Sequence, residues 1–174
     1  ITAAADIIAG AFNALPKRVC NQHKFSDYAD YLHENLPAQA ELDLQREKPL
    51  NPAPLVSVAI ACSGASRAAV RSTLEALGKQ TYANFEVCVV SELAQAGLTD
   101  YEGIPKFRLV LFNGTAHEQL KAAEKMLNGA YFLQLLPGDL PAPDALHMLV
   151  LQTHANPEAE VVFADEDSVI DGIP

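Results

Sequence analysis

The stretch that decides the fold reads Val56-Ser57-Val58-Ala59-Ile60-Ala61-Cys62, and it runs into a small polar loop, Ser63-Gly64-Ala65-Ser66. A nearly continuous apolar run is typical of a parallel strand that is covered on both faces. Ser66 is a good N-cap residue, and apolar residues recur on one face of the helix predicted over residues 67–80. The stretch therefore predicts the first strand–loop–helix step of an α/β domain.

Strand and helix patterns alternate after this first step. Strand patterns occur at residues 85–90, 107–112, 131–136 and 160–164, and further helical patterns at residues 116–127 and 143–155. Such alternation predicts one mostly parallel sheet with right-handed crossovers, in which the strand at 56–62 is central. Ligands of these sheets bind beyond the carboxyl ends of the strands. We therefore expect four loops to lie together at one edge, those at Ser63, Ser91, Asp139 and Asp165.

The first 50 residues have a different character. Helical apolar spacing precedes Pro16, a second helix is predicted from the N-cap Ser26 to Leu36, and a weaker one covers residues 38–46. Residues 48–54 are rich in proline and predict a semi-rigid linker. We therefore divide the chain into a helical lead-in at 1–50 and an α/β domain at 51–174.

Composition narrows the classes of function. The chain has 174 residues and a formal net charge of −10, which argues against a general nucleic-acid binder because phosphate affinity comes from clustered Lys and Arg. Residues 1–15 contain Asp6 and too few apolar residues to cross a bilayer, so we expect no membrane span. The chain's cysteines, which lack CxxC spacing, predict reduced thiols in a cytoplasmic protein: Cys20, Cys62 and Cys88.

Several motifs in a fixed order carry a family resemblance. Gln80-Thr81-Tyr82-Ala83-Asn84-Phe85-Glu86 closely matches a Gln-Thr-Tyr-x-Asn-Phe-Glu motif. Leu136-Pro137-Gly138-Asp139 stands where an Asp-x-Asp-Asp metal motif is found, just before a Leu-x-x-Pro-x-Ala-Leu-like segment at 140–146. Residues 156–167 are similar to a run in bacterial O-antigen and capsule transferases. Residues from about 54 to 172 thus resemble the family 2 glycosyltransferases, whose GT-A fold is a Rossmann-like α/β fold.

The resemblance implies a chemistry and its partners. It implies a nucleotide-sugar donor and a glycan or lipid-linked acceptor in the synthesis of a bacterial surface polysaccharide. In the family, carboxylates hold Mg²⁺ or Mn²⁺ against the diphosphate leaving group, and another acid deprotonates the acceptor hydroxyl. That base comes late in the family's sequence, so we expect it beyond Pro174 and expect this chain to be the nucleotide-binding half. The positions that correspond to the donor site are Ala61, Ser63, Ser91, Glu92 and Asp139.

This chain departs from the family where the chemistry needs acids. Leu136 and Gly138 stand at the first two acids of the metal motif, so that Asp139 alone predicts a weak site for Mg²⁺ or Mn²⁺. Ser91 replaces the acid that holds the uracil or ribose, with Glu92 beside it, and Ala61 replaces the loop proline. A second interpretation is therefore a non-catalytic GT-A-like scaffold or interaction domain that has lost its metal-binding acids.

Two further features stay open at this point. The acidic cluster Asp165-Glu166-Asp167 either lines the donor or acceptor cleft or is a solvated strand end before a turn. The loop at residues 63–66 either presents amides to a phosphate or is an ordinary capped turn, because it lacks both glycine-rich phosphate-binding motifs. The histidines on predicted helices are interpreted as surface or core-edge residues: His117, His147 and His154.

Overall fold

The computed structural model describes residues 36–92 and 104–164. The chain separates into two compact units, Ala38–Val150 and a second that holds Leu151–Pro174 with the first 37 residues. The parallel sheet belongs to the unit Ala38–Val150. The helices predicted before Leu36 and the acidic cluster at residues 165–167 lie outside the described residues.

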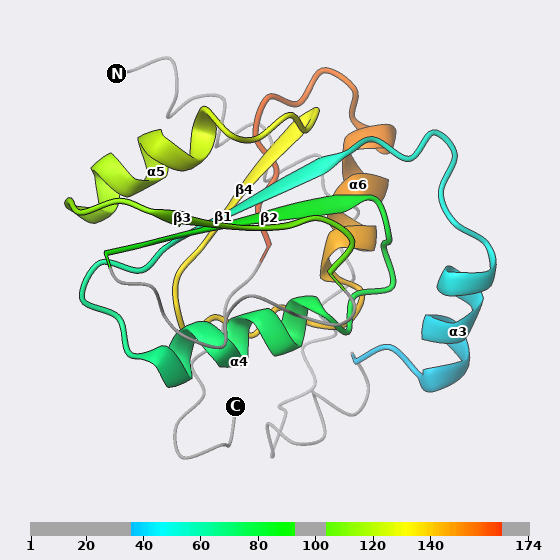
Figure 1. Cartoon of the computed structure of the whole chain (residues 1–174). Helices are drawn as coiled ribbons and strands as arrows, with labels where there is room; N and C mark the ends of the chain where they lie inside the picture. The colour runs from blue at the N-terminus through cyan, green and yellow to red at the C-terminus, as the bar shows by residue number, and fades with distance from the viewer. Residues whose placement is uncertain (1–35, 93–103, 165–174) are drawn as a thin grey trace, which may run out of the picture. The chain divides into compact units, whose positions relative to one another are not determined.

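The core of this unit is a parallel sheet of four strands in the order β3-β2-β1-β4 (Figure 1). The strands are β1 (Val56–Ala61), β2 (Phe85–Ser91), β3 (Phe107–Leu111) and β4 (Tyr131–Leu135). Strand β1 pairs in parallel with β2 on one side and with β4 on the other. Every residue of β1 and β2 is buried, which is the reason for their continuous apolar sequences. The predicted α/β class and the central position of β1 are confirmed.

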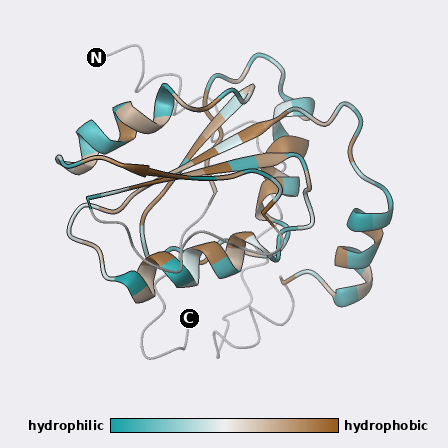
Figure 2. Cartoon of the chain, viewed as in Figure 1, coloured by the Kyte–Doolittle hydropathy of each residue, from teal (hydrophilic) through white to brown (hydrophobic). Residues whose placement is uncertain are grey.

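Helices cover the two faces of the sheet. Helix α4 (Arg67–Leu77) packs with the first part of α6 (Ala145–Ala155) against one face, where Val58, Ile60 and Val89 belong to the larger apolar cluster. Helix α5 (Ala116–Glu124) covers the other face, where a smaller cluster joins Ala59, Cys88, Val90 and Ala123. Figure 1 shows α4 and α5 on opposite sides of the strands, and Figure 2 shows hydrophobic colour concentrated in the central strands.

Side-chain caps fix where two of these helices begin. The Ser66 hydroxyl accepts a hydrogen bond from the Ala69 amide, as the sequence predicted. Helix α5 begins with a capping box, in which Thr115 Oγ1 accepts from the Glu118 amide and the Glu118 carboxylate accepts from the Thr115 amide. Local capping residues therefore determine where both helices begin.

Helix α3 (Gln39–Glu47) and the proline-rich linker belong to the same compact unit as the sheet. Leu42 and Gln45 are the buried residues of α3. Tyr82 donates to the carbonyl of Pro54, and Asn84 Nδ2 donates to the carbonyl of Ala53 at 2.7 Å. These two hydrogen bonds attach the end of the linker to the residues that precede β2. The division at residue 50 stays a prediction, because residues 1–35 lie outside the described part.

Some predicted elements differ from the structure. The strand predicted at residues 160–164 is not formed. A strand depends on pairing with another segment, and an apolar run does not by itself specify that pairing. Helix α5 ends at Glu124 instead of Leu127, and the Met126 amide already bonds to the Ala123 carbonyl in a tighter turn. Beyond the helix, Gly129 lies close to β1, and a β-carbon there would lie 2.5 Å from Ser57 Oγ.

Candidate functional site at the carboxyl edge of the sheet

The strand order places a switch point beside β1. From β1 the chain adds β2 and then β3 on one side, whereas β4 lies on the other side. The strand order therefore reverses between β1 and β4, and open α/β sheets bind ligands at such a point, beyond the carboxyl ends of the strands. Here this edge is formed by the loop at 62–66 after β1 and by the turn at 136–139 after β4.

The loop after β1 is short and leads directly into α4. Ala61 is buried, and the Cys62 amide still donates to the Val90 carbonyl at 2.9 Å. The chain then turns, with the Ala65 amide 3.1 Å from the Cys62 carbonyl and Gly64 at a φ of +70°. The Ser63 side chain is exposed. The loop therefore offers an open polar position in front of the positive end of a helix dipole.

The end of β2 supplies the next two predicted positions. Ser91 is buried, and its carbonyl accepts from the Phe112 amide at 2.9 Å, which ties the ends of β2 and β3 together. Glu92 follows and is exposed. Of these two positions, the carboxylate at Glu92 is thus the one that solvent reaches at this edge.

Asp139 closes a turn on itself. Its Oδ2 accepts from the Leu136 amide at 2.6 Å, and its own amide donates to the Leu136 carbonyl at 3.0 Å. Gly138 has a φ of +107°, a conformation that favours glycine. The Leu136 side chain is 59% exposed, so an apolar group stands where the sequence resemblance predicts a carboxylate.

The residues of this turn do not fit a magnesium or manganese site. Such cations take several oxygen ligands, with carboxylates foremost. Leu136 and Gly138 have no side-chain donor atom, and a backbone amide already occupies one oxygen of Asp139. Across residues 36–92 and 104–164, no three His, Cys, Asp or Glu side chains gather as metal ligands.

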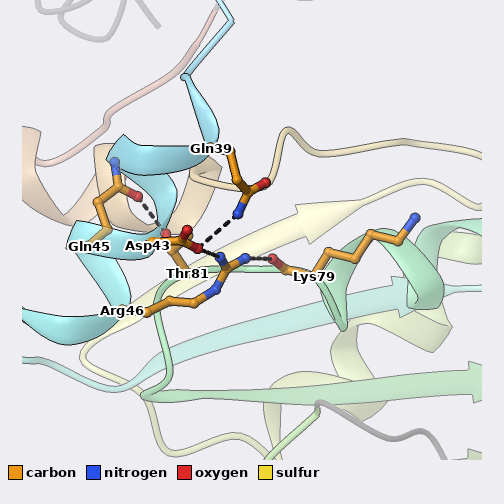
Figure 3. Close-up of polar contacts among 6 residues, drawn as sticks. All are labelled: Gln39, Asp43, Gln45, Arg46, Lys79 and Thr81. Atoms are coloured by element: carbon orange, nitrogen blue, oxygen red, sulfur yellow. Dashed lines mark hydrogen bonds and ion pairs between the residues drawn. The ribbon is translucent and has the colours of Figure 1, made fainter.

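The motif that matches the family best lies at the opposite end of the sheet. Gln80 Nε2 donates to the Ala142 carbonyl at 2.6 Å, and Gln80 Oε1 accepts from the Leu146 amide at 3.0 Å, which fixes the start of α6. Thr81 Oγ1 donates to Gln45 Oε1 of α3 at 2.6 Å (Figure 3). Residues 80–86 thus join elements at the amino ends of the strands and do not take part in the candidate site.

Glu86, the last residue of this motif, is a buried charge with a complete set of partners. Its Oε1 accepts from Ser57 Oγ at 2.7 Å and from the Asn128 amide at 2.6 Å, and its Oε2 lies 3.0 Å from Arg108 Nη1. Burial raises the pKa of this carboxyl, but the hydrogen bonds from Asn128 and Ser57 and the charge of Arg108 outweigh burial and hold the pKa below its ordinary value. Sequence reasoning missed this network, although a glutamate inside an apolar strand was its signal.

Two cysteines of the strands behave as small apolar residues. Cys62 and Cys88 are buried free thiols. Burial raises the pKa of Cys62 to about 11 and also raises the pKa of Cys88. The reduced state predicted for these two is present, while Cys20 lies outside the described residues and the cytoplasmic location stays a prediction.

The other residues considered in the sequence analysis are three histidines and the acidic cluster at 165–167. His117 is exposed, and His147 is buried on α6, where burial lowers its pKa against the opposing effect of Asp144. His154 lies near the end of α6, in the second unit. Asp165, Glu166 and Asp167 lie outside the described residues, so both interpretations of the acidic cluster remain predictions. None of the described helices has the length and apolar character of a bilayer span.

Comparison with known proteins gives partial matches. An uncharacterized protein named y4gI from Sinorhizobium fredii is 31% identical over 127 residues, which cover 68% of this chain and 14% of that protein. This chain thus spans only a small part of that relative. Among solved structures, TarS from S. aureus matches 58% of this chain and 19% of its own chain, at 17% sequence identity and a TM-score of 0.49. No protein-family model matches the chain.

Proposed function

We propose that this chain is the nucleotide-binding half of a glycosyltransferase-type domain that takes a nucleotide-sugar donor. The observation that carries the proposal is the switch point between β1 and β4, because the loops that meet there are those that the order of the family-like motifs assigns to the donor. The bacterial surface polysaccharide pathway and the glycan or lipid-linked acceptor belong to the same proposal and rest on the sequence resemblance.

Each part of the edge has a role in this proposal. The loop at 63–66 and the first amides of α4 lie toward the diphosphate, where a helix dipole favours negative charge. Ser91 and Glu92 lie toward the base or ribose, with the Glu92 carboxylate able to accept hydrogen bonds from ribose hydroxyls. The turn at 136–139 borders the sugar. Ala61, which is buried at the end of β1, positions the loop that follows it.

We expect no sugar transfer by this chain alone. Transfer requires a base placed against the acceptor hydroxyl and stabilisation of the charge on the leaving diphosphate. Asp139 is the acid that remains of the metal motif, and one of its carboxylate oxygens already accepts a hydrogen bond from the Leu136 amide. Nucleotide release from a panel of nucleotide sugars, with and without lipid-linked acceptors, should equal that of a heat-denatured control. Release well above this control would show that a complete active site lies within these residues.

Nucleotide binding is the direct test of the proposal. Two exposed loop positions at opposite ends of the sheet give a matched pair of variants, Ser63→Tyr at the proposed site and Ala83→Tyr at the amino end. Calorimetric titration with UDP, GDP and ADP should show binding of at least one nucleotide. The variant Ser63→Tyr should weaken that binding at least tenfold, because its ring fills the open position before α4, and Ala83→Tyr should not. Equal binding by both variants would place the nucleotide elsewhere.

A second function is supported by the same turn. The chain would be a GT-A-like scaffold that joins neighbouring domains without binding a donor, and the observation in favour is that Asp139 closes a turn while Leu136 replaces an acid. The titration separates the two functions. Failure of all three nucleotides to bind to the folded wild-type chain would favour the scaffold.

A further inference from the structure

We propose that the turn Leu136–Asp139 is a clamp that joins the end of β4 to α4, and that this edge takes its nucleotide without a divalent cation at the turn. The clamp stands on geometry alone. The second half rests on the proposed function, because it concerns how the proposed ligand binds.

The inner part of the clamp is the ring of hydrogen bonds between Leu136 and Asp139. Asp139 Oδ2 accepts from the Leu136 amide at 2.6 Å, while the Asp139 amide donates to the Leu136 carbonyl at 3.0 Å. The carboxylate thus satisfies an amide at the point where β4 ends and its backbone loses its strand partner. In this role Asp139 acts as a hydrogen-bond acceptor, for which a neutral amide oxygen is also suited.

The outer part of the clamp reaches α4 through Gly138. The Gly138 amide lies 2.9 Å from Thr73 Oγ1 and 3.1 Å from the Ala69 carbonyl. Thr73 is fully buried, and its hydroxyl lies 3.2 Å from the Ala69 carbonyl and 3.4 Å from the Leu136 carbonyl, so its hydrogen has an acceptor on either side. The hydroxyl therefore accepts from the turn and donates beside it, which joins two elements that are 65 residues apart in sequence.

The clamp and a cation site make opposite demands on Asp139. A cation needs the negative charge and free lone pairs of the carboxylate, together with further oxygen ligands. The clamp uses one of these oxygens for an amide, holds Gly138 at a φ of +107° and leaves an exposed leucine, Leu136, at the first acid position of the motif. For the same reason, the turn should tolerate an acid at position 136 better than one at position 138. Leu136→Asp meets solvent, whereas Gly138→Asp would force an ordinary side chain into a conformation that it rarely adopts.

Two matched pairs of variants test the clamp by urea unfolding. Asp139→Asn keeps an acceptor for the Leu136 amide, and Asp139→Ala removes it. Thr73→Ser keeps the hydroxyl, and Thr73→Val removes it at similar volume. We expect Asp139→Ala and Thr73→Val each to raise the unfolding equilibrium constant about fivefold to tenfold relative to its partner variant. If Asp139→Asn is as unstable as Asp139→Ala, or Thr73→Ser as unstable as Thr73→Val, the clamp is wrong.

Cation dependence tests the second half of the inference. UDP should bind to the wild-type chain with the same affinity, within about twofold, in Mn²⁺, in Mg²⁺ and in EDTA. Binding that needs Mn²⁺ and disappears in Asp139→Asn would overturn the inference and leave the proposed function standing. No UDP binding under any condition would contradict cation-free binding as well as UDP as the ligand, and the unfolding measurements would still decide the clamp by themselves.

Discussion

Glu86 carries a carboxylate, a group that often serves in catalysis, but here it stabilises the fold. A buried carboxylate is costly unless donors surround it, and here Ser57, Asn128 and Arg108 do so from three separate segments. We predict that Glu86→Gln destabilises the domain by about 2 kcal/mol at neutral pH, because it removes charge-assisted hydrogen bonds. Glu75→Gln is the control, since the Glu75–Arg71 pair is exposed on both sides and should cost far less.

The pH dependence of this effect has a definite sign. The folded-state pKa of Glu86 lies below its ordinary value, so its stabilisation is fully present above the ordinary glutamate pKa and is lost as the pH falls through the folded-state pKa. Urea unfolding of wild type and Glu86→Gln should therefore show a gap at pH 7 that shrinks under acid conditions. A gap that stays constant across this range would mean that the charge of Glu86 does not contribute.

Gly129 is the second residue whose role depends on its surroundings. A β-carbon there would lie 2.5 Å from Ser57 Oγ and 2.8 Å from the Leu55 carbonyl. We predict that Gly129→Ala destabilises the domain by about 1–3 kcal/mol, since β4 must move away from β1. The neighbouring Ala130→Ser, at an exposed position, is the control in the same thermal unfolding measurement. Equal melting temperatures for Gly129→Ala and wild type would show that the backbone yields without cost.

Helix α3 illustrates at the element scale how a sequence motif can hold a structure together. Arg46 lies between Asp43 and the Lys79 carbonyl, and Thr81 meets the buried Gln45 (Figure 3). We predict that Thr81→Val costs about 1–3 kcal/mol, because Gln45 Oε1 then lacks its buried donor. The double variant Thr81→Val with Gln45→Leu should recover part of the loss in a double-mutant cycle of unfolding free energies. Additive losses would show that the two side chains do not interact.

The sequence predicted elements well where burial alone determines them. The continuous apolar character of β1 and β2 arises from burial on both faces, so their type, order and central position were predictable. The similar apolar run at 160–164 does not form the predicted strand, because pairing with another segment cannot be read from the run itself. The close approach of Gly129 to Ser57 escaped prediction for a related reason, since the two residues lie far apart in sequence.

The position of the loops after β1 and β4 was predictable, but the contacts within them were not. Strand order placed the loops after β1 and β4 at one edge, as the alternating pattern predicted. What Asp139 does there depends on a turn that closes on Leu136 and on Thr73 beneath it. Neither contact can be recognised in the sequence. Comparison with the metal motif shows that two acids are absent, but it does not show which hydrogen bonds Asp139 makes.

At the scale of the whole molecule, the reactivity of the two buried thiols can measure how different parts of the sheet open. Cys62 belongs to the cluster under α4 and stands next to the exposed loop at 63–66, whereas Cys88 lies in the middle of β2 within the cluster under α5. Burial raises the pKa of both thiols, so neither is a ready thiolate at pH 8. Reaction with a thiol reagent must then wait for an opening of the structure.

We predict that Cys62 reacts before Cys88, and that nucleotide slows Cys62 more than Cys88. Opening the edge exposes Cys62 without unfolding β2, while Cys88 needs global unfolding, so low urea should accelerate Cys62 first. Single-cysteine variants made by replacing Cys20 and one strand cysteine with alanine give separate rates with a chromogenic disulfide. A nucleotide that binds at the β1–β4 switch point should protect Cys62 and change the rate of Cys88 only as far as it raises global stability. Equal protection of both thiols would mean that the ligand stabilises the whole unit without acting at this edge.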